Sequence, residues 1–128
     1  YLEKWNELRR KHAARYSGLL SKFGFVLPTE ASYAKSVFHL YVIRAAERDR
    51  LNAFLNERGI GSLVHYPKPN HLIGCYRSLG YSKGSLPVTE KVCKDVLSLP
   101  LYPELTDPQI QTVTGAIESF LLSAKSAK

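Results

Sequence analysis

The chain has 128 residues, the size of one domain, and 45% of them are hydrophobic, which is enough apolar material for a core. No stretch approaches roughly 18 consecutive apolar residues, and the N-terminus is charged and amphipathic, so we expect neither a transmembrane helix nor a signal peptide in this sequence. Its 18 basic and 11 acidic residues give a net charge of +7.

This positive charge is divided between the two ends of the sequence. The basic residues concerned are Arg9, Arg10, Lys11, Arg15, Lys125 and Lys128. Such a charge can attract nucleic acid or a phosphorylated ligand, but no helix-turn-helix spacing follows the basic stretch. We interpret most of it as a solvated helix face and expect neither a nucleic-acid nor a membrane partner, with a basic nucleic-acid-binding domain as the alternative.

The sequence begins at Tyr1 and contains no methionine, so we expect a fragment of a longer protein, with a processed or an engineered chain as the alternatives. Its two cysteines, Cys75 and Cys93, both lie among apolar residues. Two cysteines are too few for a disulfide framework, and buried free thiols in a reducing cytoplasm are the simpler interpretation. A single disulfide between them stays open.

The first predicted element is a helix over residues 1–22. Its apolar residues recur at steps of three and four, which places them on one face. They are Leu2, Trp5, Leu8, His12, Tyr16, Leu19 and Leu20. Gly24 ends the pattern, and residues 25–36 form a connection without periodicity. Residues 37–44 are apolar almost throughout, which predicts a strand covered on both faces.

A second helix is predicted from about residue 48 to Arg58, with Asp49 as its N-cap or first-turn acid. Gly59 stands where a helix ends in the left-handed conformation, and Ile60 follows as its hydrophobic partner. Residues 61–65 are predicted to form a short strand. Residues 72–80 are predicted to hold a short helix that ends at Gly80.

Pro87 opens the next predicted helix. The side chains expected to face inward from it are Val88, Val92, Cys93 and Val96. Residues 98–103 are expected to be extended. Thr106 and Gln109 form a capping-box signature before the last helix. Its expected apolar face consists of Ile110, Val113, Ile117, Phe120 and Leu121.

The order of these elements favours one α+β domain over residues 1–122, followed by a tail over residues 123–128 that we expect to fray. Too few strands are visible for a doubly wound sheet, and there is no internal repeat. We therefore predict a small, mostly antiparallel sheet packed against helices.

The segment 65–71, His-Tyr-Pro-Lys-Pro-Asn-His, is the most informative part of the sequence. Its two prolines fix φ and push the residues before them toward extended geometry, which predicts a stiff loop. The side chains of His65, Tyr66, Lys68 and His71 can donate to anionic oxygens or stack. We interpret the loop as a site for an anionic or hydroxyl-rich ligand. The alternative is that the tyrosine and prolines pack and the histidines cap backbone groups.

Other kinds of site have less support in the sequence. A metal site made of His65, His71 and Cys75 would match no common structural zinc spacing. Neither a nucleophile elbow nor a Gly-rich phosphate loop is present. We therefore expect no metal and no catalytic residue in this chain. His39, within the predicted strand, is interpreted as a core or edge histidine, with a ligand contact as the alternative.

Six pieces of the sequence, in the right order, resemble the DegT/StrS family of sugar-nucleotide aminotransferases across residues 1–122. They are the run from Arg10 through Ala13, Tyr16 and Leu20; Phe38-His39-Leu40-Tyr41-Val42 with Arg48-Asp49; Leu55 with Gly59-Ile60; His65-Tyr66-Pro67-x-Pro69-x-His71; Pro87 with Glu90; and Ser98-Leu99-Pro100-Leu101-Tyr102-Pro103 with the Thr106 to Val113 helix. The part resembled is the family's small C-terminal domain, which begins with a linking helix.

The resemblance implies the small domain of the type I aminotransferase fold, in a cytoplasmic homodimer that uses pyridoxal phosphate. In that family a large N-terminal domain carries the lysine that forms the Schiff base, and the small domain packs over the cofactor cleft. The implied reaction transfers an amino group from glutamate to a keto sugar on a nucleotide, as in polysaccharide biosynthesis. The resemblance also implies substrate-binding roles for His65, Tyr66 and His71, while Lys68 stands at a variable position.

The sequence departs from the family in lacking the large domain, and none of its lysines lies in the Schiff-base motif. We therefore expect the parent enzyme to transaminate, with its own N-terminal domain as this chain's partner, and the isolated polypeptide to be inactive. A homologue that has lost catalysis and acts as a sensor or regulator stays open, because the discriminating lysine lies outside this sequence.

Overall fold

The computed structural model describes residues 1–126 and has an α+β fold. Its helices are α1 (Leu2–Leu20), α2 (Arg48–Asn56), α3 (Pro87–Asp95) and α4 (Asp107–Ser126), and its strands are β1 (Tyr41–Arg44) and β2 (Val96–Leu99). Short 3-10 helices cover Ser21–Phe23, Asn70–Leu72 and Gly74–Leu79. β1 and β2 pair antiparallel, so the predicted fold class is confirmed.

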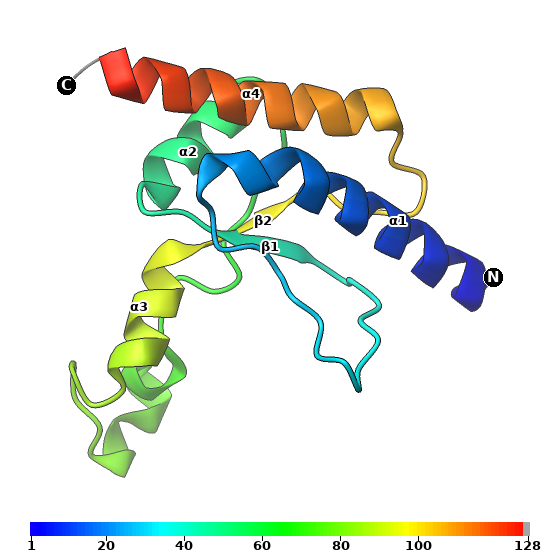
Figure 1. Ribbon diagram of the computed structural model, residues 1–128. Helices are drawn as coiled ribbons and strands as arrows, with labels where there is room; N and C mark the ends of the chain where they lie inside the picture. The colour runs from blue at the N-terminus through cyan, green and yellow to red at the C-terminus, as the bar shows by residue number, and fades with distance from the viewer. Residues whose placement is uncertain (127–128) are drawn as a thin grey trace.

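The core lies between the helices and one face of the sheet. α1 and α4 run side by side over this face, and α2 packs against α4 (Figure 1). Side chains alternate between the faces of a strand, and Tyr41 and Ile43 are fully buried on the covered side. Val42 and Arg44, on the opposite side, are only half-buried. From α4 the core receives Ile110, Val113, Ile117 and Phe120, as the sequence predicts.

Two helix boundaries follow the local signals in the sequence. Gly59 has a φ of 71°, and the N–H of Ile60 donates to the carbonyl of Leu55 over 3.0 Å, as in a Schellman ending. Before α4, the N–H of Thr106 donates to Oε1 of Gln109 over 2.9 Å, which is one half of the predicted capping box. The predicted end of α2 is confirmed, and the predicted capping box is present in this one half, since the hydroxyl of Thr106 also donates to Oε1 of Gln109.

α1 confirms the predicted N-terminal helix, but only its second half packs against the body. His12, Tyr16 and Leu20 are buried, whereas Leu2 is 62% and Trp5 is 42% exposed. In Figure 1 the first turns of α1 extend beyond the sheet. The N-terminal part of the predicted apolar face is therefore uncovered in this chain.

The strands differ from those predicted. The strand expected over residues 37–44 begins only at Tyr41, because Phe38 takes a φ of 45° and leaves the extended region. Only one face of it is closely covered, so the prediction of two covered faces was wrong. The strand expected over residues 61–65 is reduced to a single bridge between Leu63 and Ser98. β2 begins at Val96, a residue that we expected in the preceding helix.

α3 begins at Pro87 as predicted, but its buried side is polar. Val88 is 77% exposed, so its predicted inward orientation was wrong, and the buried residue of the helix is Glu90. Cys93 is partly buried and Cys75 is exposed, and both are free thiols. The expected burial of Cys75 was therefore also wrong.

The C-terminal helix continues into the predicted tail. α4 runs to Ser126, so residues 123–126 are helical, and residues 127–128 of the predicted tail lie outside the described residues. None of the helices within residues 1–126 combines the length and the apolar character needed to cross a lipid bilayer.

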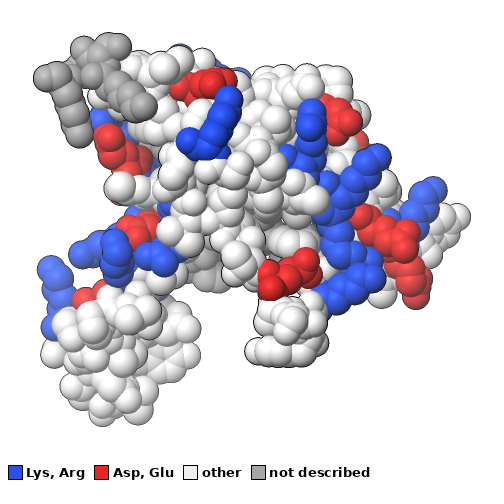
Figure 2. Space-filling view, viewed as in Figure 1, with Lys and Arg blue, Asp and Glu red and all other residues white. Residues whose placement is uncertain are grey.

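Two arginines of α1 stabilise the fold instead of forming a solvated face. Nε of Arg9 donates to the carbonyl of Val37 over 3.0 Å, and Nη1 of Arg10 donates to that of Ser36 over 3.5 Å. These bonds attach the arm, which we define as residues 28–40, to α1. Figure 2 shows Lys and Arg side chains interspersed with acidic ones over this side of the molecule. The interpretation as a solvated face does not hold for these two arginines.

The phenols of Tyr16 and Tyr41 predict a loss of stability at alkaline pH. Both are buried, and their ring centroids lie 5.1 Å apart. Burial raises the pKa of Tyr16 well above its ordinary value of 10.0, helped by Tyr102 and Tyr41. Burial also raises the pKa of Tyr41, although its hydrogen bond with Ser17 opposes the shift.

Because these pKa values are higher in the folded chain, their contribution to stability is complete below about pH 10 and is lost as the pH rises further. We expect the free energy of unfolding to fall by up to about 1.4 kcal/mol per pH unit for each phenol above that pH. Urea denaturation between about pH 9 and about pH 11 would measure this slope. If the free energy of unfolding did not change with pH, or changed equally in a Tyr16→Phe variant, the buried phenol of Tyr16 would not be the cause.

Candidate functional site

The loop 65–71 leaves the edge of the sheet and begins a lobe, residues 66–86, that projects from the body beside α3 (Figure 1). Just before it, Leu63 and Ser98 exchange two backbone hydrogen bonds of 3.2 and 2.8 Å. The loop contains no strand or α-helix, as predicted, and enters a 3-10 turn at Asn70–Leu72. Its outer side borders an open hollow of about 430 Å³, lined by Tyr66, Pro67, Lys68, Asn70 and Ile73.

His65 is half-buried at the base of the loop. Its Nδ1 lies 2.9 Å from Oγ of Ser98, which sits on the buried strand β2. Its ring meets that of Tyr66 edge-on, with centroids 5.5 Å apart. The bond to Ser98 orients the imidazole, and Nε2 has no hydrogen-bond partner among the described residues. Nε2 of His65 can therefore serve a ligand while Nδ1 is held.

His71 is buried, so its side chain is not open to direct contact with a ligand. It is only 7% exposed, and its Nε2 lies 3.1 Å from Oε1 of Glu90. The ring of Tyr81 packs against it edge-on, with centroids 6.2 Å apart. Its Nδ1 is buried and has no hydrogen-bond partner among the described residues. His71 thus links the loop to α3 through a side chain, and it does not cap a backbone group.

The carboxylate of Glu90 is the centre of this buried cluster. Besides His71, it accepts a hydrogen bond from the N–H of Gly84 over 2.7 Å. Burial by itself raises the pKa of Glu90, but the hydrogen bonds from Gly84, His71 and the backbone near Leu86 outweigh that effect and lower it. The carboxylate therefore stays ionised at neutral pH and remains an acceptor for both donors.

The remaining predicted site residues are Tyr66, Lys68 and His39. Tyr66 is 71% exposed, and Lys68 is exposed beside it on the hollow. His39 is also exposed and precedes β1, so its interpretation as a core or strand-edge histidine was wrong. No hydrogen bond or ring contact within the described residues joins it to the loop 65–71.

Sequence reasoning missed two residues of this site, Glu90 and Ser98. Glu90 resembles an ordinary acid in the first turn of a helix, and Ser98 resembles part of an extended stretch. Their partners are remote in sequence, 19 residues away for Glu90 and 33 for Ser98. No local spacing signals such pairs.

The described residues do not enclose a cofactor or a metal by themselves. An amine that forms a Schiff base is activated by being desolvated in a pocket, and every lysine within residues 1–124 is exposed. Groups of three or more His, Cys, Asp or Glu side chains placed to hold a metal ion are absent from the part of the chain that the structure describes.

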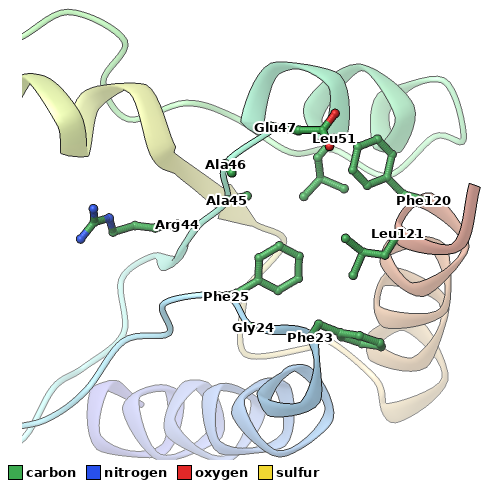
Figure 3. A pocket seen from close by; sticks show the side chains of 10 residues that line it. All are labelled: Phe23, Gly24, Phe25, Arg44, Ala45, Ala46, Glu47, Leu51, Phe120 and Leu121. Carbon is green, nitrogen blue, oxygen red and sulfur yellow. The ribbon is translucent and has the colours of Figure 1, made fainter. Parts of the chain in front are cut away.

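A second hollow, of about 180 Å³, lies where the end of α1, the start of α2 and α4 meet (Figure 3). Its walls are mainly apolar, from Phe23, Phe25, Leu51, Phe120 and Leu121. The Arg44 side chain points away from it in this view, and Glu47 at its rim pairs with Arg50. Because most of the side chains that line this hollow are apolar, the candidate site is the loop 65–71.

The model of the DegT/DnrJ/EryC1/StrS aminotransferase family matches residues 1–118. A protein of Geobacillus stearothermophilus named pleiotropic regulatory protein is 48% identical over 123 residues, which cover 94% of this chain and 33% of that protein. The dTDP-3-amino-3,4,6-trideoxy-alpha-D-glucose transaminase of Streptomyces venezuelae is 40% identical over 121 residues, covering 94% of this chain and 32% of the enzyme.

Among solved structures, that of S. venezuelae DesV in complex with a ketimine intermediate superposes with a TM-score of 0.88 at 39% identity, covering 92% of this chain and 32% of that one. The chain thus spans about a third of the length of these relatives. The family match extends over nearly the whole sequence and agrees with the fold. This chain belongs to the DegT/DnrJ/EryC1/StrS aminotransferase family.

Proposed function

We propose that this chain is the small C-terminal domain of a pyridoxal-phosphate-dependent transaminase that moves an amino group from glutamate to a keto sugar carried on a nucleotide. The relatives' printed names support the nucleotide-sugar class, because they include several dTDP- and UDP-sugar aminotransferases. The observation that carries the proposal is the loop 65–71, which presents a ring and a cation at an open hollow on a lobe that projects from the body.

The loop offers the groups that such a substrate needs. The ammonium of Lys68 and the phenol of Tyr66 are exposed on the same hollow, where they can meet anionic oxygens and a base or sugar ring. The imidazole of His65 stands behind Tyr66 with Nε2 available as a donor or acceptor. In this proposal His65 and Tyr66 contact the substrate, Lys68 adds charge, and His71 acts indirectly because it is buried against Glu90.

Pyridoxal phosphate, when bound, supplies the electron sink for transamination. The residues of this chain do not fit it alone, because none of the lysines within residues 1–124 is enclosed. We therefore assign the Schiff-base lysine to another part of a longer, homodimeric protein, and expect the isolated 128-residue chain to be inactive. The free thiols of Cys75 and Cys93 agree with a cytoplasmic enzyme.

An assay of the full-length protein with glutamate and a set of dTDP- and UDP-linked keto sugars tests this function. We expect one of these sugars to be converted to an amino sugar, with 2-oxoglutarate formed in equal amount. If no amino sugar forms although the cofactor is bound, the proposal is wrong and a regulatory role gains support.

A substitution at Tyr66 tests the place of the site. Tyr66→Ala is expected to lower kcat/KM for the nucleotide sugar by about 5- to 150-fold, because a contact of this kind contributes about 1–3 kcal/mol. Tyr33→Ala is the matched control, since Tyr33 is 92% exposed on the arm. Equal effects of the two substitutions, or no effect of either, would remove Tyr66 from the substrate site.

A further inference from the structure

The lobe has almost no apolar core of its own. Most of its large apolar side chains are exposed: Tyr66, Leu72, Ile73, Tyr76, Leu79 and Tyr81. Figure 2 shows the lobe at the lower left as a largely uncharged projection, separated from the arm by a recess. Its only buried residue among those described is His71. Apolar packing therefore does not explain how the lobe keeps its place.

The carboxylate of Glu90 holds the lobe at two points. Oε1 accepts hydrogen bonds from the N–H of Gly84, near the end of the lobe, and from Nε2 of His71, at the end of the candidate binding loop. Hydrogen bonds to an ionised, buried acceptor are among the stronger ones in proteins. One side chain thus joins both ends of the segment 71–84 to α3.

α3 is itself attached firmly to the body. The carboxylate of Asp95, at the end of the helix, pairs with Arg44 of β1 at 3.0 Å, and its carbonyl accepts the N–H of Ala45 over 2.9 Å. Near the same end, Arg48 donates to the carbonyls of Cys93 and Val96 over 3.2 and 2.9 Å. A displacement of Glu90 relative to the sheet would break several of these bonds.

The two ends of the loop are therefore fixed by different residues. Ser98 holds His65 at its start, and Glu90 holds His71 at its end. Between them Tyr66 and Lys68 remain exposed at the hollow. Because both ends of the loop are held, the exposed side chains between them keep a fixed position relative to the sheet.

We propose that Glu90 is a positioning residue for the nucleotide-sugar site: it touches no substrate, and it fixes the loop 65–71 by binding His71 and Gly84. This inference rests on the function proposed above. It assigns to Glu90 a role in substrate affinity that differs from a general contribution to the stability of the domain.

The test compares Glu90→Ala with Glu104→Ala in the full-length protein, because Glu104 is an exposed glutamate outside the lobe. Glu90→Ala is expected to raise KM for the nucleotide keto sugar by roughly 10- to 100-fold, the size of effect that a misplaced binding group produces. KM for glutamate should stay unchanged. Glu90→Gln keeps one acceptor oxygen, so its KM for the sugar should lie between those of the wild type and Glu90→Ala. His71→Ala should raise KM for the sugar as Glu90→Ala does.

Hydrogen exchange of the same proteins gives a readout that does not depend on activity. In Glu90→Ala we expect faster exchange in residues 66–86 and no change in α1 and α4. Unchanged exchange in the lobe, an unchanged KM for the sugar, or an equal rise in KM for glutamate would overturn the positioning role. A wild-type protein that transfers no amino group to any keto sugar would instead overturn the proposed function, whatever the exchange shows.

Discussion

Replacing Tyr16 by alanine is expected to lower the free energy of unfolding by about 4 kcal/mol, the usual cost of removing a fully buried aromatic side chain. Tyr16 has no exposed surface, stacks on Tyr41 with ring centroids 5.1 Å apart, and donates its phenol hydrogen to the carbonyl of Pro100 over 3.0 Å. It therefore connects α1, β1 and the segment after β2 at one point of the core.

Two further variants, measured by urea denaturation, separate the contribution of the Tyr16 hydroxyl from that of its buried ring. Tyr16→Phe keeps the ring and should cost about 1.5 kcal/mol, because the carbonyl of Pro100 loses its donor. Tyr33→Ala removes a tyrosine that is 92% exposed and should change stability by less than about 0.5 kcal/mol. If Tyr16→Ala were as mild as Tyr33→Ala, the assignment of Tyr16 to the core would be incorrect.

Arg48→Ala is expected to cost about 3 kcal/mol of unfolding free energy. The guanidinium of Arg48 is buried and donates to the carbonyls of Cys93 and Val96 over 3.2 and 2.9 Å. These carbonyls lie where α3 ends and β2 begins, so their loss of a donor leaves polar groups unpaired between the helix and the sheet.

Substitutions at Arg48 and Arg50 distinguish the effect of the buried hydrogen bonds of Arg48 from the effect of removing a positive charge. Arg48→Lys should restore less than half of the loss, because an ammonium lacks the planar fork that reaches both carbonyls. Arg50→Ala, at an exposed position paired with Glu47, should cost less than about 1 kcal/mol. Equal costs for Arg48→Ala and Arg50→Ala in urea denaturation would show that the buried hydrogen bonds contribute little.

Local patterns in the sequence were enough to predict several elements and to single out the loop 65–71 as the candidate site. The end of α2 follows from Gly59 and Ile60, and the start of α4 follows from Thr106 and Gln109, because these signals act within one or two helical turns. The loop 65–71 was recognised for a similar reason, since prolines restrict the backbone wherever they stand. The α+β class followed from the number and order of the elements.

The sequence by itself therefore determined the helices, the irregular loop and the family. Only the tertiary structure decided which face of each strand is covered and what the two loop histidines contact. Ser98 and Glu90 lie 33 and 19 residues from His65 and His71, and chain folding alone brings them together. A hydrogen bond between remote side chains leaves no periodic signal, because its formation depends on the packing of every element between them.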